Sequence, residues 1–215
     1  NTPEGITTDG EYLYVADARN HAIRKINMQS LSVVTLAGMR GQGGLANGIG
    51  SVAQFNGPTG ITLLGEYLYV ADTDNHTVRR VNKNSGETVT VTMRYETLGI
   101  EDSTILQYPM GITTDGKYLY IADTFNHKIK RLNPDTGVLS TLSGKTGGGF
   151  VNGLLSDAKY MYPYGLVIKG SELFVAELWN EDIRVIDLTY GIVSTIAGTP
   201  TVVGSLDGPP GVGQF

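Results

Sequence analysis

The chain contains no cysteine among its 215 residues. Disulfide bonds, cysteine–metal sites and a catalytic thiolate are therefore excluded from it. The lack of cysteine also fits a bacterial protein that is exported from the cytoplasm.

Long hydrophobic runs are missing as well. No stretch of about 18 consecutive apolar residues occurs, so we expect no membrane span in this segment. The chain begins at Asn1 without a signal peptide, and we interpret it as a mature chain or as an excerpt of a longer one.

Basic residues are too few and too scattered for a phosphate-binding surface. The chain has 16 Lys and Arg against 21 Asp and Glu, which gives a net charge of −5. Because nucleic-acid binding normally needs clustered Lys and Arg, the sequence predicts no nucleic-acid partner. The acidic balance mildly favours a basic protein partner.

Histidine is rare, and each of the three histidines follows an asparagine in the same local sequence. The copies are Ala16–His21, Ala71–His76 and Ala122–His127, with an altered fourth copy at Ala176–Glu181. Recurrence in a fixed frame indicates a repeat signature rather than a catalytic cluster. Histidines on separate turns cannot converge on one metal ion, and no Gly-x-Ser-x-Gly elbow is present, so we predict no catalytic residue and no metal site.

The repeated element belongs to a longer unit that opens with Pro-x-Gly. The openers start at Pro3, Pro58, Pro109 and Pro163, a period of roughly 51–55 residues. Each unit contains four short runs of alternating apolar residues, bounded by Gly, Asn or Asp, as in 12–16, 23–26 and 31–37. Period-two alternation predicts strands and not the helices of a solenoid.

These units predict an all-β fold: a β-propeller of four four-stranded antiparallel blades, complete or part of a larger ring. The expected units are approximately 1–55, 56–106, 107–160 and 161–215. We expect the inter-blade core to contain Ile6, Ile61, Ile112 and Leu166 together with Val15, Val70, Ile121 and Val175.

The Pro-x-Gly-Ile opener, the Tyr-Val-Ala-Asp-x-x-Asn-His turn and the Thr-Leu-Ala-Gly closer resemble NHL-repeat β-propellers of the bacterial, exported type. The resemblance covers essentially the whole chain, although the fourth unit departs at Glu177 and Glu181. It implies a propeller fold and an extracellular, cell-surface or periplasmic location. Because the family includes binding modules, sensors and lyases, it does not decide the function.

An acidic residue precedes each Asn-His turn, and we assign it a structural role. The residue is Asp17, Asp72 and Asp123 in the first three units and Glu177 in the fourth, whereas an active site needs one copy. Seven residues later a basic residue follows in the next strand, which predicts ion pairs with Arg24, Arg79 and Lys130, and between Glu177 and Arg184. His21, His76 and His127 are assigned to packing of the same turns.

The residue after each opening proline should lie near the central hub. These residues are Glu4, Thr59, Met110 and Tyr164. They make a poor cage for Ca²⁺ or Zn²⁺, so we expect no cofactor and no enzymatic activity. The alternative is a metal-assisted lyase or lactonase with its site in the central channel.

One position of the turn varies strongly while its flanks stay nearly constant. It holds Arg19, Asp74, Phe125 and Trp179. Variable side chains on a fixed turn are how repeat scaffolds present a binding face. We predict that these four residues, with Tyr162 and Tyr164, contact a partner, and we expect Tyr160 near Trp179 too. The alternative is that Trp179 and these tyrosines pack between blades.

The sequence therefore favours a non-catalytic protein-interaction scaffold outside the cytoplasm. The expected partner is another protein, and self-association could complete a ring. Besides the lyase or lactonase, a ligand-sensing ectodomain of a larger receptor is a further alternative.

Overall fold

The computed structural model describes residues 1–92, 105–209 and 211–215. They form an all-β structure in which the helical elements are single 3₁₀ turns. Within these ranges, no helix has the length and apolar character needed to cross a membrane.

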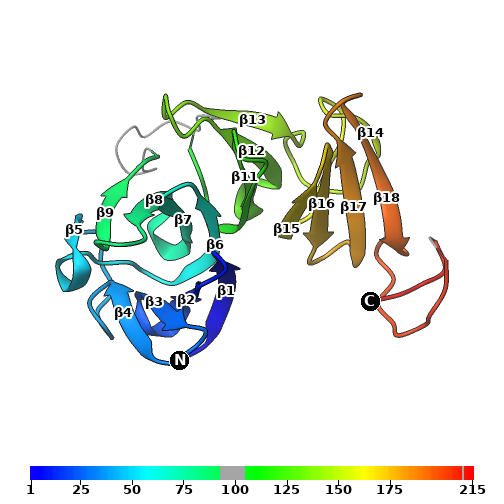
Figure 1. The fold of residues 1–215 in the computed structure, drawn as a ribbon. Coiled ribbons are helices and arrows are strands. Elements are labelled where there is room, and N and C mark those ends of the chain that lie inside the picture. The colour runs from blue at the N-terminus through cyan, green and yellow to red at the C-terminus, as the bar shows by residue number, and fades with distance from the viewer. Residues whose placement is uncertain (93–104, 210) are drawn as a thin grey trace.

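The strands form four antiparallel sheets that follow one another around a central hub (Figure 1). Each sheet is a blade in which four consecutive strands pair in order from the hub outwards. The predicted four-bladed β-propeller is confirmed. Figure 1 also shows that the blades describe an arc, with a space between the fourth blade and the first.

The four main strands of each blade have these bounds. Blade 1 contains β1 (Pro3–Thr8), β2 (Tyr12–Asp17), β3 (Ala22–Asn27) and β4 (Val33–Ala37). Blade 2 contains β6 (Pro58–Leu64), β7 (Tyr67–Asp72), β8 (Thr77–Asn82) and β9 (Glu87–Thr90). Blade 3 contains β10 (Pro109–Thr114), β11 (Leu119–Asp123), β12 (Lys128–Leu132) and β13 (Leu139–Ser143). Blade 4 contains β15 (Pro163–Lys169), β16 (Glu172–Glu177), β17 (Asp182–Asp187) and β18 (Ile192–Gly198).

Two blades gain a short fifth strand that the sequence did not predict. The chain returns from the outer edge of one blade to the hub of the next, and on its way it pairs with the outer strand of that next blade. β5 (Gly48–Ile49), followed by the 3₁₀ turn η2 (Gly50–Val52), pairs with β9, and β14 (Gly153–Leu154) pairs with β18. The return segments are therefore part of the blade interfaces.

The glycine of the Pro-x-Gly opener lets neighbouring inner strands approach each other closely. A Cβ atom on Gly5 would collide with the carbonyl oxygen of Thr59 in the next blade. Gly60 meets the Met110 carbonyl in the same way, and Gly111 meets that of Tyr164. Glycine is the residue that permits such an approach of two backbones.

The core lies between consecutive blades and consists of three clusters of buried side chains. Most of the predicted core residues are buried, as Val70 and Ile121 illustrate with 0% exposure. The prediction was wrong for Ile6, which is 60% exposed, whereas Ile61 at the same place in blade 2 is 6% exposed. Blade 1 covers the face of blade 2 that bears Ile61, and no described blade covers the face that bears Ile6.

Candidate functional site

The Asn-His elements form the turns between the second and third strands of the first three blades. They are the 3₁₀ turns η1 (Ala18–Asn20), η3 (Thr73–Asn75) and η5 (Thr124–Asn126), each ending in a histidine in the left-handed conformation. The histidine Nδ1 accepts a hydrogen bond from the next blade: His21 from the Gly57 N–H, His76 from that of Tyr108 and His127 from that of Tyr162. The histidines thus link consecutive blades.

The acidic residues before these turns form the ion pairs that their spacing predicted. Asp72 lies 3.0 Å from the Arg79 guanidinium and Glu177 lies 2.9 Å from that of Arg184. The Asp123 carboxylate and Lys130 Nζ are 3.9 Å apart. The turn asparagine also donates to the same carboxylate, at 2.8 Å in the pair Asn75–Asp72.

The buried arginines also hold the return segment that precedes their blade. Arg79 donates to the carbonyl oxygens of Gln54 and Ala46 and to Asn47 Oδ1. Arg184 does the same toward the equivalent segment, from Val151 to Lys159. The guanidinium groups of both arginines form their hydrogen bonds and ion pairs within the protein, so these side chains stabilise the scaffold.

Blade 4 carries one buried carboxylate more than the other blades. Asp182 is 2% exposed, and the described residues offer its carboxylate at most the Thr195 hydroxyl as a hydrogen-bond donor. The equivalent residue in blade 1 is Ala22. Burial raises the pKa of Asp182 to about 6. Burial, joined by repulsion from Asp182, raises the pKa of Glu177 to about 7 despite the nearby Arg184.

This extra carboxylate predicts an unusual pH dependence. Carboxyl groups whose pKa is raised by folding favour the folded state when protonated, so stability is lost as the pH rises from about 4, the ordinary pKa of a carboxyl group, and the loss is complete above the raised pKa values of about 6 to 7. We expect Asp182→Ala to stabilise the chain at pH 8 by on the order of 1–2 kcal/mol and to have a much smaller effect at about pH 4, near the pKa of an unfolded aspartate. Thermal melts of both proteins at the two pH values test this, and an equal effect at both would contradict it.

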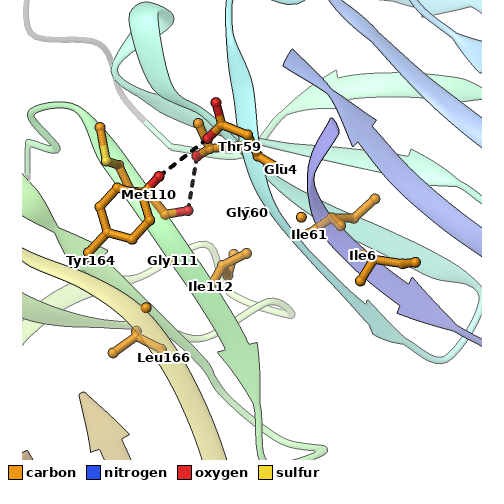
Figure 2. A pocket seen from close by; sticks show the side chains of 12 residues that line it. Glu4, Ile6, Thr59, Gly60, Ile61, Met110, Gly111, Ile112, Tyr164 and Leu166 are labelled. Atoms are coloured by element: carbon orange, nitrogen blue, oxygen red, sulfur yellow. Dashed lines mark hydrogen bonds between the residues drawn. The ribbon is translucent and has the colours of Figure 1, made fainter. Parts of the chain in front are cut away.

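The hub is open at one end, and the four residues that follow the opening prolines line it, as predicted. Figure 2 shows Glu4, Thr59, Met110 and Tyr164 together at this end, with aliphatic side chains deeper in the channel. The pocket has a volume of about 240 Å³. Thr59 donates to the Met110 carbonyl at 3.1 Å, and the Tyr164 hydroxyl donates to Glu4 Oε2 at 3.4 Å.

The hub offers one carboxylate and one phenol as ionisable groups. Burial, together with the nearby Glu4 carboxylate, raises the pKa of Tyr164 above its ordinary value. Nowhere in residues 1–92, 105–209 and 211–215 do three His, Cys, Asp or Glu side chains gather as metal ligands would.

The turn face of the molecule carries a continuous row of aromatic rings. Phe125 and Trp179, from the turns of blades 3 and 4, are 45% and 61% exposed. Tyr162 lies between them, with ring centroids 5.4 Å from Phe125 and 5.1 Å from Trp179. Tyr108 extends the row at 4.6 Å from Phe125, and His76 and His127 contact its tyrosines edge to face. We call Tyr108, Phe125, Tyr162 and Trp179 the aromatic row.

The charged members of the variable turn position lie on the other side of the hub mouth. Arg19 and Asp74 are exposed residues of the turns of blades 1 and 2. Both line a depression of about 550 Å³ that also includes Glu4, His21 and Tyr164. The turn face is therefore aromatic over blades 3 and 4 and charged over blades 1 and 2.

Sequence reasoning missed one member of the row and misplaced one tyrosine. Tyr108 and Tyr162 both precede an opening proline, where the other two units have Thr2 and Gly57. This second variable position is the signal that would have found Tyr108. Tyr160, which was expected near Trp179, is instead fully buried in the core of blade 4.

A repeat model described as LVIVD repeat matches residues 4–22, 59–78 and 108–127, which run from the opener through the Asn-His turn. The NHL repeat-containing protein 2 of Bos taurus is 26% identical over 304 residues, covering 97% of this chain and 42% of that protein. The chain thus spans less than half the length of this relative.

Two solved structures share the fold at low sequence identity. A protein of unknown function from Bacteroides thetaiotaomicron superimposes with a TM-score of 0.64 at 19% identity, over 99% of this chain and 62% of that one. A virginiamycin B lyase from Staphylococcus aureus superimposes with a TM-score of 0.60 at 16% identity, over 90% and 55%. The repeat match, the relatives and the blade architecture agree, and the chain is a β-propeller whose repeats are similar to those of NHL repeat-containing proteins.

Proposed function

We propose that this chain is a non-catalytic protein-interaction scaffold whose working surface is the turn face. The aromatic row is the observation that carries the proposal. Exposed aromatic side chains at fixed spacing on a rigid frame are typical anchors of protein interfaces. Phe125 and Trp179 are 45% and 61% exposed. Four aromatic rings in contact could instead have formed a buried cluster, and their exposure therefore favours a role in binding.

The frame under the row is rigid, which lowers the entropic cost of binding. The turn of blade 3 is held by Asn126, whose Nδ2 donates to Asp123 at 2.8 Å. Thr124, two residues before Asn126, donates to the Pro163 carbonyl of the next blade, also at 2.8 Å. Among residues 123–127, Phe125 is the exposed one, so its side chain is available to a partner.

The charged half of the face would orient that partner. Arg19 and Asp74 present opposite charges beside the depression at the hub mouth. Charges at the rim of an interface steer association and set its register more than they add affinity. The partner we infer is therefore a protein with an apolar ridge flanked by polar groups. We further propose that the scaffold works outside the cytoplasm, and that copies of the chain associate through the open ends of the arc.

The first test compares wild type with the Phe125→Ala/Trp179→Ala double variant in affinity capture from envelope and secreted fractions. Because both side chains are exposed, we expect the captured protein to be lost while the melting temperature stays within about 2 °C. Tyr190→Ala is the matched control, since Tyr190 is 78% exposed at the opposite end of the strands of blade 4. A variant that captures the same protein as wild type would refute the proposed surface.

A second candidate function is a lyase or lactonase at the hub, and the Tyr164–Glu4 hydrogen bond is the observation that favours it. A phenol beside a carboxylate can relay a proton to a bound substrate. Activity screening of wild type against Glu4→Gln and Tyr164→Phe tests this candidate. If wild type turns over a substrate and both variants lose this activity, the lyase or lactonase function replaces the scaffold proposal.

A further inference from the structure

The middle of the aromatic row stays exposed although aromatic rings flank it on both sides. Phe125 lies between Tyr108 and Tyr162, with ring centroids at 4.6 and 5.4 Å, and is still 45% exposed. Rings that pack only to fill a core lose their contact with solvent, as Tyr160 does in blade 4. The exposure of Phe125 therefore points to a ligand that packs on the row.

The rings of the row are tilted against one another, so the surface consists of ridges and notches. Successive ring planes along the row, from Tyr108 to Trp179, make angles of 41°, 79° and 45°. A sugar stacks on the flat face of a ring, so a platform for a glycan needs rings that are turned the same way. Notches between aromatic rings instead receive the bulky, rigid rings of proline in an extended chain.

Three members of the row carry a polar group for which the described residues provide no partner. The hydroxyl groups of Tyr108 and Tyr162 and the indole N–H of Trp179 take part in no hydrogen bond there. Phenol and indole groups donate hydrogen bonds. A proline-rich segment offers many acceptors and few donors, because proline has no N–H and the polyproline II helix has no internal hydrogen bonds. The row and such a segment are therefore complementary.

A carboxylate continues the row beyond Tyr108. Tyr162 contacts Phe125, which is the variable residue of the turn in the preceding blade. The corresponding turn before Tyr108 carries Asp74 at this position, and Tyr108 packs edge to face on His76 of that turn at 4.3 Å. Asp74 is exposed, and its carboxylate makes no ion pair within the described ranges. It is therefore available to a basic residue of a ligand.

The depression that Asp74 lines strengthens the preference for a basic group. It has a volume of about 550 Å³, and its described lining includes the carboxylates of Asp74 and Glu4 and one guanidinium, that of Arg19. Opposite charges across an interface set the register of the partner. A basic residue next to a proline-rich stretch would therefore fix the position of that stretch on the row.

We propose that the turn face binds a proline-rich segment of the partner protein in the polyproline II conformation. The proline rings would occupy the notches of the aromatic row, the three donors would bind main-chain carbonyl oxygens, and a basic residue would pair with Asp74. The centroid distances of 4.6, 5.4 and 5.1 Å along the row correspond to about five residues of such a helix, which rises roughly 3.1 Å per residue. The proposal rests on the scaffold function, because it names the class of partner for the same surface.

Trp179 is the only tryptophan of the chain, so its fluorescence tests the proposal in the wild-type protein. The probe is a peptide of six prolines followed by two arginines, together with the peptide in which the arginines come first. We expect one of the two to shift the emission of Trp179 to shorter wavelengths in a saturable way and to lower its quenching by acrylamide at least about twofold, because bound ligand excludes water from interface aromatics. A Gly-Ser peptide with the same two arginines is the control and should change neither quantity.

Variants assign the individual contacts. Tyr162→Ala should weaken peptide binding at least about tenfold, and Tyr162→Phe, which keeps the ring and loses the hydroxyl, about threefold. Asp74→Asn should weaken binding of the arginine peptide by about two- to fivefold, as for an exposed ion pair, and should leave binding of an uncharged proline peptide unchanged. Tyr190→Ala, at the opposite end of blade 4, should stay within about twofold of wild type. Circular dichroism verifies that every variant is folded.

Wild type whose emission neither proline peptide changes at concentrations up to about 1 mM would overturn the proposal. An equal response to the Gly-Ser peptide, or binding that Tyr162→Ala leaves unchanged, would overturn it too. A saturable response to cellohexaose with none to the proline peptides would identify a glycan-binding surface in its place. If affinity capture still depends on Phe125 and Trp179 while the proline peptides do not bind, the scaffold function stands and this inference fails.

Discussion

A chain carrying Val70→Asp is expected not to accumulate as a soluble, folded protein. Val70 is fully buried in the cluster between blades 1 and 2, where Tyr14, Ile23 and Ile61 surround it. An unpaired carboxylate in such a place costs more than about 4 kcal/mol, a large part of the roughly 5–15 kcal/mol by which domains are stable. Soluble yield and circular dichroism measure the effect.

The matched control uses two isoleucines that occupy the same place in their units. Ile61→Asp should have the same consequence as Val70→Asp, because Ile61 is 6% exposed. Ile6→Asp should leave a soluble, folded chain, because Ile6 is 60% exposed. Equal behaviour of these two variants would show that the packing of blade 1 on blade 2 is described wrongly.

Replacing the buried Arg79 by methionine should cost about 3–5 kcal/mol of stability. The substitution leaves the Asp72 carboxylate buried without its cation and removes the donor from the Gln54 and Ala46 carbonyl oxygens. For a chain of this size, the melting temperature should fall by roughly 6–20 °C.

Arg24→Met is the control for this prediction. Arg24 has the same place in blade 1, but its ion pair with Asp17 is longer, at 3.9 Å, and partly exposed. We expect a loss below about 1 kcal/mol, as for other solvent-exposed ion pairs. If both variants lost the same stability, the return segment 44–55 would not be the reason for the importance of Arg79.

The residues of the aromatic row were predicted from the sequence only in part. Phe125 and Trp179 stood out because their turn position varies while its neighbours do not. Tyr108 did not stand out, because it lies 17 residues before Phe125 and belongs to the opener of its blade. The His76 and His127 bonds to the following blade help to bring openers and turns together, and such contacts between blades make a row out of separate residues.

The sequence by itself determined the four main strands of each blade, the turns between them and the order of the blades. Period-two alternation and the glycines act over a few residues, and their physical effect is local. The tertiary structure alone decided which of two identical residues is core and which is surface. Ile6 and Ile61 both follow the glycine of an opener, and they differ in whether a described neighbouring blade packs on them. Burial depends on contacts between blades, and the local sequence of a repeat does not specify those contacts.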